Sequence, residues 1–115
     1  MAMNDKRMHF RKSLRADAAI ADVLGNTWSY VNFLDLSRDG VAFISAEHHL
    51  VGSSRILRFH FPNNAKSITV ICKIIYSSAH SFLPGYRVGA KFVRIDIEDM
   101  ELIDLFINNA VATLA

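Results

Sequence analysis

Apolar and polar residues alternate in several short segments of the chain, and this two-residue period predicts β-strands. The clearest case is RILRFHF at residues 55–61, where Leu57, Phe59 and Phe61 share one side of an extended chain. Residues 13–23 alternate more loosely and are predicted as a half-buried strand, although their alanines leave a helix open as an alternative. Each of these segments is therefore expected to turn one face toward a core.

Four further strands are predicted from β-branched and aromatic residues bounded by turn signals. They are TWSYVNFLDL (27–36), VAFI (41–44), SITVICKIIYSS (67–78) and PGYRVGAKFVRI (84–95). The turns between strands are Gly25-Asn26, SRDG (37–40), the polar connection SAEHHLVGSS (45–54) and PNNAK (62–66). Six modest strands joined by short turns predict an antiparallel barrel or sandwich.

The last segment has a helical period. Asp96 is suited to cap a helix at about 97–113. Two acidic residues in the first turn of this helix would interact favourably with the positive end of the helix dipole. Apolar residues then recur at helical spacing and form one stripe. They are Leu102, Ile103, Phe106, Ile107, Ala110, Val111 and Leu114. This helix is expected to pack on the barrel or on one of its open ends.

Composition agrees with one domain: 115 residues with 51% hydrophobic content suffice for one core. No apolar run approaches the roughly 20 residues of a membrane helix, and no signal peptide is visible, so a soluble cytoplasmic protein is expected. The one cysteine, Cys72, cannot form an internal disulfide, and its apolar strand predicts a buried thiol in a reducing compartment.

Catalytic motifs are missing. The histidines at 9, 48, 49, 60 and 80 show no metal-ligand spacing and are interpreted as solvated loop residues. Cys72 lacks the signature of a nucleophile, and the five glycines are too far apart for a phosphate-binding loop. The sequence thus predicts a protein that is not an enzyme and needs no cofactor.

Charge is unevenly distributed, although the net charge is only +2. Basic residues crowd the first fifteen positions, and acidic residues crowd the segment from 96 to 104. Residues 1–12 are interpreted as a flexible arm that precedes a barrel domain at 13–115. The arm carries RMHFR, in which the planar guanidinium groups of Arg7 and Arg11 could each bind two phosphate oxygens or a guanine edge. A solvated, solubilising arm is the plainer alternative.

A second candidate motif is DLSRDG at residues 35–40. The Asp35 carboxylate can accept the N1 and N2 hydrogens of guanine, and the Ser37 hydroxyl can add one hydrogen bond. Gly40 permits a tight turn with positive φ or the close approach of a ligand. The alternative is structural, because Asp35 and Ser37 could simply build an Asx or serine turn between two strands.

Together the two motifs resemble the PilZ domain family, whose signature is RxxxR followed after twenty to thirty residues by [D/N]xSxxG. Here 23 residues separate RMHFR from DLSRDG. The resemblance extends to LDLSRDGVAF and to GYRVGAKFVRID with its following acidic helix, and it covers about residues 6–109. It implies a six-stranded antiparallel β-barrel with a C-terminal helix.

The resemblance also implies a ligand, because many PilZ domains are receptors for the bacterial second messenger cyclic di-GMP. Arg7 and Arg11 would then bind its phosphates and the guanine Hoogsteen edges, and Asp35, Ser37 and Gly40 would form the guanine site on the barrel. Lys6 and Arg38 are additional candidates at positions that vary in the family.

Ligand binding is expected to order the arm and so to change the surface that an effector protein recognises. No membrane or nucleic-acid partner is expected. Two alternatives stay open: a PilZ-like interaction module that does not bind nucleotide, and a small barrel that binds single-stranded nucleic acid. The second would need a basic groove with exposed aromatics, whereas Arg38 is the only basic residue from 16 to 54.

Overall fold

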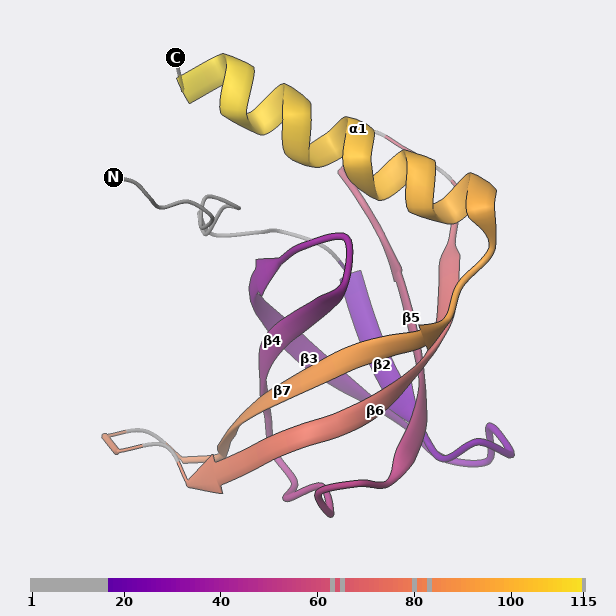
Figure 1. The fold of residues 1–115 in the computed structure, drawn as a ribbon. Helices are drawn as coiled ribbons and strands as arrows, with labels where there is room; N and C mark the ends of the chain where they lie inside the picture. Colours follow the sequence, from indigo (N-terminus) through magenta and orange to yellow (C-terminus); the bar gives the residue numbers. More distant parts are fainter. Residues whose placement is uncertain (1–16, 63, 65, 80, 83, 115) are drawn as a thin grey trace.

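The computed structural model of the chain describes residues 17–62, 64, 66–79, 81–82 and 84–114. Six strands precede one helix, as the alternating pattern predicts (Figure 1). The strands are β2 (Asp17–Ala21), β3 (Trp28–Leu36), β4 (Gly40–Ser45), β5 (Ser54–His60), β6 (Ile68–Ala79) and β7 (Tyr86–Arg94). The helix α1 spans Ile97–Leu114 and begins directly after Asp96.

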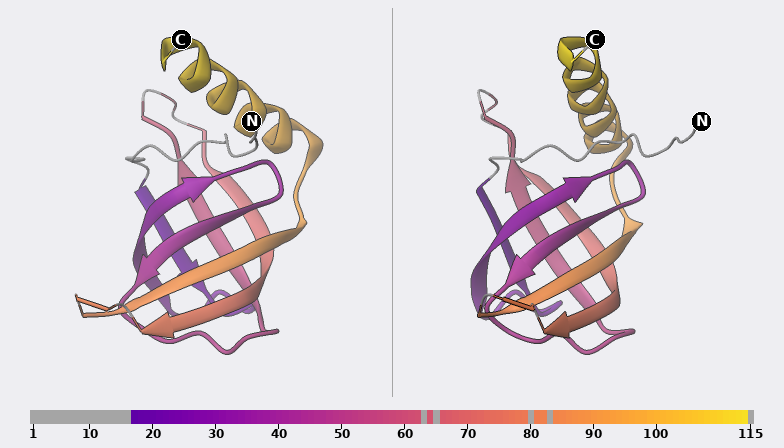
Figure 2. Two further views of the ribbon diagram at one scale, coloured as in Figure 1. Left: turned by 60° about the vertical axis from the view of Figure 1, so that its left-hand side comes forward. Right: turned by 90° about the vertical axis from the view of Figure 1, so that its left-hand side faces the viewer.

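The strands form a closed barrel in the order β2-β3-β4-β7-β6-β5, and every pairing is antiparallel. Pairing of β2 with β5 closes the barrel, for example through Ala18 opposite Phe59. In the two views of Figure 2, the strands are tilted and together enclose one interior. This arrangement confirms the six-stranded barrel and excludes the sandwich, since closure leaves neither β2 nor β5 as a free edge.

The core lies inside the barrel because strand residues with the two-residue period point inward. Leu57 and Phe59 of β5 and the neighbouring Phe61 are buried, as their alternation with polar residues predicts. The Phe59 ring packs edge-on against Phe33 of β3 at a centroid distance of 5.0 Å. Cys72 is completely buried within β6, and burial raises the pKa of its thiol to about 11. This confirms the packed thiol and argues against a nucleophilic role, which requires the thiolate.

Helix α1 covers one end of the barrel (Figures 1 and 2). Its predicted apolar stripe provides the contact: Ile103 is completely buried, and the Phe106 ring stacks on Phe61 with a centroid distance of 4.0 Å. At the first turn, Lys66 lies 3.0 Å from a carboxylate oxygen of Asp99. The hydrogen bond to Asp99 raises the pKa of Lys66. Apolar packing and this ion pair together fix the helix on the barrel.

One prediction about the histidines is wrong. His48 is exposed in the β4–β5 connection, but its neighbour His49 is only 5% exposed. His49 Nε2 lies 3.1 Å from the hydroxyl of Ser45, which is also buried. Arg55 Nε donates a hydrogen bond to His49 Nδ1 over 3.3 Å. Ser45 ends β4 and Arg55 belongs to β5, and these two polar partners compensate for burial of the imidazole. The polar sequence of the connection does not reveal these contacts.

Two further observations concern metal ions and membrane spans. Within the described residues, no group of three or more histidine, cysteine or acidic side chains could hold a metal ion. No helix in the described part of the chain combines the length and the apolar character needed to cross a membrane.

Candidate functional site

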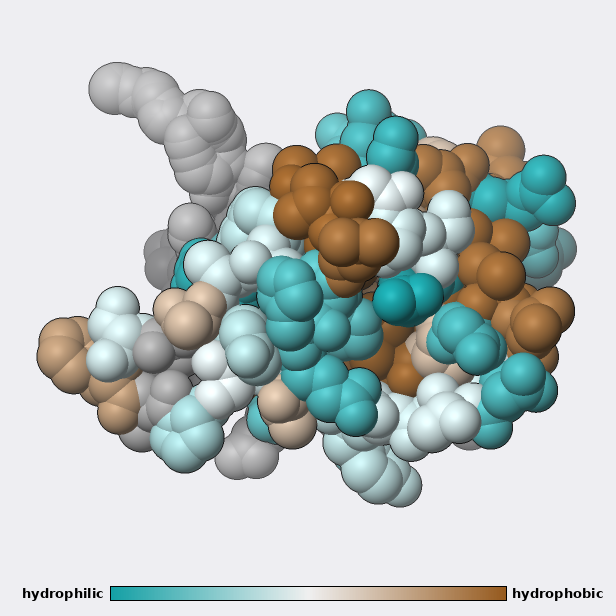
Figure 3. Space-filling model, turned by 90° about the horizontal axis from the view of Figure 1, so that it is seen from below, coloured by the Kyte–Doolittle hydropathy of each residue, from teal (hydrophilic) through white to brown (hydrophobic). Residues whose placement is uncertain are grey.

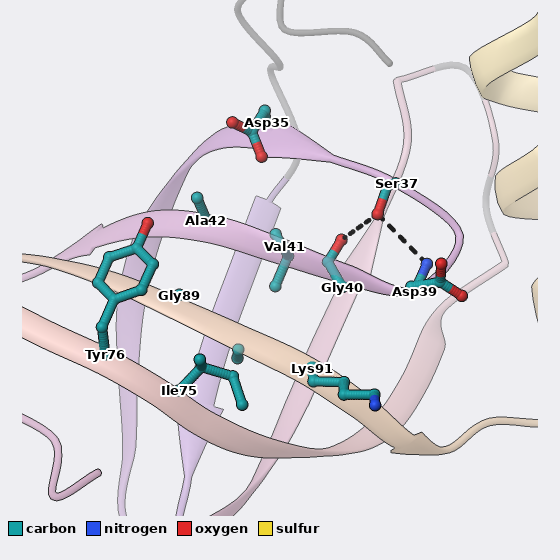
Figure 4. Close-up of a pocket in the computed structure, with 11 residues that line it drawn as sticks. Asp35, Ser37, Asp39, Gly40, Val41, Ala42, Ile75, Tyr76, Gly89 and Lys91 are labelled. Atoms are coloured by element: carbon teal, nitrogen blue, oxygen red, sulfur yellow. Dashed lines mark hydrogen bonds between the residues drawn. The ribbon is translucent and has the colours of Figure 1, made fainter. Parts of the chain in front are cut away.

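The DLSRDG segment forms the tight turn between β3 and β4. The backbone N–H of Ser37 donates to the carbonyl oxygen of Gly40 over 2.9 Å. The Ser37 hydroxyl donates to the same oxygen over 3.4 Å and accepts from the backbone N–H of Asp39 over 3.3 Å (Figure 4). Ser37 therefore stabilises the turn between the two strands, as the structural alternative for this residue predicts. The turn is also attached to β7, because the N–H of Phe92 donates to the carbonyl oxygen of Asp39 over 2.8 Å.

A β-bulge in β3 determines where Asp35 points. Phe33 lies opposite Phe43 of β4, whereas Asp35 lies opposite Ala42, so Leu34 is an extra residue in the pairing. If β3 alternated strictly, Asp35 would point into the core as Phe33 does. The bulge instead puts Asp35 on the barrel wall and Leu36 in the core. The carboxylate of Asp35 consequently faces a groove.

The groove has a volume of about 580 Å³ and crosses the barrel wall from the β3–β4 turn to β6. Figure 4 shows Asp35 and Ser37 on one side and Tyr76 and Ile75 on the other. It is lined by Asp35, Ser37, Asp39, Gly40, Val41, Ala42, Ile75, Tyr76, Gly89, Ala90 and Lys91. Three residues of the predicted site thus share one hollow: Asp35, Ser37 and Gly40.

Gly40 has a steric role in the barrel that is separate from the close approach of a ligand expected from its motif. It is not among the glycines with positive φ, so the turn does not require it for that reason. A Cβ atom at position 40 would overlap the backbone carbonyl oxygen of Ala90 on the adjacent strand. Gly40 therefore permits β4 to approach β7 closely at the place where the groove crosses both strands.

Arg38, a further predicted site residue, does not line this groove. Arg38, at the tip of the turn, faces α1, where a guanidinium nitrogen lies 3.6 Å from a carboxylate oxygen of Asp104 and 3.3 Å from the sulfur of Met100. Arg38 lines a smaller hollow of about 290 Å³ between the turn and the helix. Lys6, Arg7 and Arg11 lie outside the described residues.

The far wall of the groove was not predicted from the sequence. It consists of Tyr76 and Ile75 of β6 and of Gly89 and Lys91 of β7. One signal was present, because an isolated glycine such as Gly89 inside a strand pattern marks a bulge or a close approach. Among the described lining residues, Lys91 is the one cation. Lys91 lies directly opposite Lys73 of β6, and like charges in this position repel each other.

Comparison with solved structures gives the same fold. The structure of the Bacillus subtilis inhibitor of motility (MotI/DgrA) has a TM-score of 0.80 at 13% identity, covering 96% of this chain and 53% of that one. Escherichia coli YcgR in complex with c-di-GMP has a TM-score of 0.71 at 15% identity, covering 91% of this chain and 46% of that one. This chain spans about half the length of both.

The isolated PilZ domain of Escherichia coli YcgR with c-di-GMP has a TM-score of 0.67 at 12% identity, and the match covers 91% of each chain. A comparison with curated proteins finds no matching sequence. The family model described as the PilZ domain matches residues 5–109, a range that includes both RMHFR and DLSRDG. The chain therefore belongs to the PilZ domain family, a family of non-catalytic c-di-GMP receptors.

Proposed function

We propose that this protein binds cyclic di-GMP in the groove beside the β3–β4 turn and passes the signal to a partner protein through its N-terminal arm. The observation that carries the proposal is the position of Asp35. A bulge turns this carboxylate out of the barrel and into a hollow that Ser37 and Gly40 also line. The solved YcgR structures with c-di-GMP have the same fold, which supports the proposal.

The chemistry of the groove suits a guanine nucleotide with phosphates. The Asp35 carboxylate can accept both the N1 and N2 hydrogens of a guanine, and the Ser37 hydroxyl stands beside it on the same turn. Lys91, at the other end of the groove, can pair with a phosphate. An anion bound there would also reduce the repulsion between Lys91 and Lys73.

The arm is proposed to supply the remaining cations. Antiparallel pairing with β3 puts Asp17, the first residue of β2, at the end of the barrel where β3 runs into the β3–β4 turn. Arg11 is six residues before Asp17, a length that spans at most about 20 Å when extended. Arg7 and Arg11 would close over the bound nucleotide, with Lys6 and Arg38 as further phosphate contacts.

Signalling would follow from this closure. In the proposal, residues 1–12 form a flexible arm on a barrel domain at 13–115, and ligand binding orders the arm against the barrel. The ordered arm changes the surface beside α1 and the groove, and an effector protein recognises that change. The protein would thus act as a receptor and adaptor and not as an enzyme.

Isothermal titration calorimetry tests the ligand and the arm together. The wild-type protein is expected to bind cyclic di-GMP, and the double variant Arg7→Ala, Arg11→Ala is expected to lose at least about 100-fold in affinity, since two charge-assisted contacts are removed. The variant Arg58→Ala, Arg94→Ala removes the same charge from the barrel wall and should bind as the wild type does. Wild-type affinity in the arm variant would refute the role of the arm.

The two other functions predict different results in related experiments. A protein-interaction module without a nucleotide site would give neither heat nor chemical-shift changes with cyclic di-GMP. A single-stranded nucleic-acid binder would release bound cyclic di-GMP when an oligonucleotide is added. Affinity capture with and without cyclic di-GMP would identify an effector as the protein whose recovery depends on the nucleotide.

A further inference from the structure

A single row of residues crosses the groove from β3 to β6. Asp35 lies opposite Ala42, Ala42 lies opposite Gly89, and Gly89 lies opposite Tyr76. The row begins with a carboxylate and ends with an aromatic ring, and the two residues between them have almost no side chain. Figure 4 shows Asp35 and Tyr76 at opposite sides of the groove, with Ala42 and Gly89 between them.

Bulges produce both ends of the row. Leu34 is the extra residue that turns Asp35 outward, and Ile75 is the extra residue between the pairs Ile74–Ala90 and Tyr76–Gly89. The second bulge makes Ile75 and Tyr76, two consecutive residues, both exposed, whereas a regular strand would bury one of them. Bulges commonly redirect side chains toward a binding site.

The ring of Tyr76 lies across the backbone of Gly89. A Cβ atom at position 89 would overlap the ring, so glycine is required for this placement. The ring therefore becomes part of the groove floor, and 39% of the Tyr76 surface stays exposed. From Gly89 to Asp35 the floor crosses two strand spacings, or about 10 Å. The result is a groove floor made of one small side chain and one aromatic ring, with a hydrogen-bond acceptor at its edge.

We infer that this row is a slot for one guanine base, which lies on Ala42 and the Tyr76 ring and presents its N1 and N2 hydrogens to Asp35. The inference rests on the proposed binding of cyclic di-GMP and adds a stacking residue, Tyr76, outside the signature motifs. Aromatic rings stack on bases because every base has a π-face. Ala42 keeps the slot open because its side chain is small, and Gly89 allows the Tyr76 ring to lie in the floor.

Substitution of Tyr76 tests the stacking. A base–aromatic stack contributes about 1–3 kcal/mol, so Tyr76→Val is expected to weaken cyclic di-GMP binding about 5- to 150-fold in titration calorimetry. Tyr76→Phe keeps the ring and should bind as the wild type does. Tyr30→Val removes a tyrosine that is 86% exposed on β3 and serves as the matched control. Equal affinity of wild type and Tyr76→Val would refute the stack.

Ala42→Leu tests the slot by filling it. Ala42 lines the groove and is only 7% exposed, so a leucine there should fill the slot and abolish measurable binding, and the circular dichroism spectrum checks that the barrel still folds. Ala42→Ser adds one atom and should retain binding. A merely structural role of Tyr76, as a cover for Gly89, would change the melting temperature and leave the affinity of the folded protein unchanged.

A spectroscopic measurement separates the slot from the proposed function. In the wild-type complex, nuclear Overhauser effects are expected between guanine H8 and the ring protons of Tyr76. If the wild type binds cyclic di-GMP but shows no such contact, and Ala42→Leu still binds, the slot is wrong and the receptor function stands. If the wild type does not bind cyclic di-GMP, both are wrong.

Discussion

At the scale of single residues, the polar network around His49 determines the protonation state of that side chain. Arg55 Nε can only donate, so His49 Nδ1 must accept, and Nε2 carries the proton that is donated to Ser45. The neutral imidazole satisfies both contacts. Burial lowers the pKa of His49, the charge of Arg55 and the neighbouring His48 lower it further, and the carboxylate of Glu47 opposes the shift.

This network predicts a stability that depends on pH. The unfolded chain takes up a proton at His49 near pH 6.5 and the folded chain only at lower pH, so stability is complete above pH 6.5 and decreases as pH falls below it. Urea unfolding from pH 7.5 to 5 should show a decrease of at most about 1.4 kcal/mol per pH unit from this group. His49→Gln should reduce the slope, and His48→Gln should retain it. An unchanged slope in His49→Gln would contradict the assignment.

At the scale of elements, the docking of α1 depends on its buried stripe. Ile103 is completely buried, whereas Leu105, two residues later on the same helix, is 56% exposed. Ile103→Ala should lower the free energy of unfolding by about 2–4 kcal/mol, because it removes buried methyl groups and leaves a cavity. Leu105→Ala should change it by no more than about 0.5 kcal/mol. Urea unfolding of both variants measures the difference, and equal effects would mean that α1 is not held by this contact.

The elements themselves could be predicted because each follows a simple local rule. The alternation of Leu57 and Phe59 identified β5 and its buried face, and the apolar stripe after Asp96 identified α1. Closure of the barrel is different, since it depends on pairing between β2 and β5, which are far apart in the chain. Neither segment carries a signal for that pairing, and the family resemblance supplied the barrel in place of the sandwich.

The candidate site could be predicted only in part for a related reason. Asp35 and Ser37 stand in one short motif, so their proximity follows from a single turn. Tyr76 and Gly89 join them through the registers of β4, β6 and β7, and a register shifted by one bulge cannot be read from alternation alone. One side of the groove therefore follows from a local sequence motif, whereas the other side depends on how the strands of the barrel pair.

At the scale of the whole molecule, the β3–β4 turn, the start of β2 and helix α1 lie at one end of the barrel (Figure 1), and the groove extends from this turn across the barrel wall. The other end carries the β2–β3 turn and the β4–β5 connection. Figure 3 shows apolar side chains on the face seen from below, and Val23, Leu24, Leu50 and Val51 are exposed in those two segments. The proposal therefore expects a ligand in the groove to change the surface near α1 and to leave this apolar end unchanged.

Closure of the arm can be measured by limited proteolysis of the full chain. Residues 1–15 contain five sites for trypsin, and the proposal expects saturating cyclic di-GMP to slow cleavage there because the arginines become engaged with phosphates and guanine edges. The variant Asp35→Ala keeps every arm site and loses the guanine acceptor, so the same nucleotide concentration should not protect it. Mass spectrometry of the fragments reports the positions of cleavage. Rapid cleavage within the arm of a wild-type protein that calorimetry shows to be saturated would mean that the nucleotide binds without closing the arm, and signalling would then have to act through the groove itself.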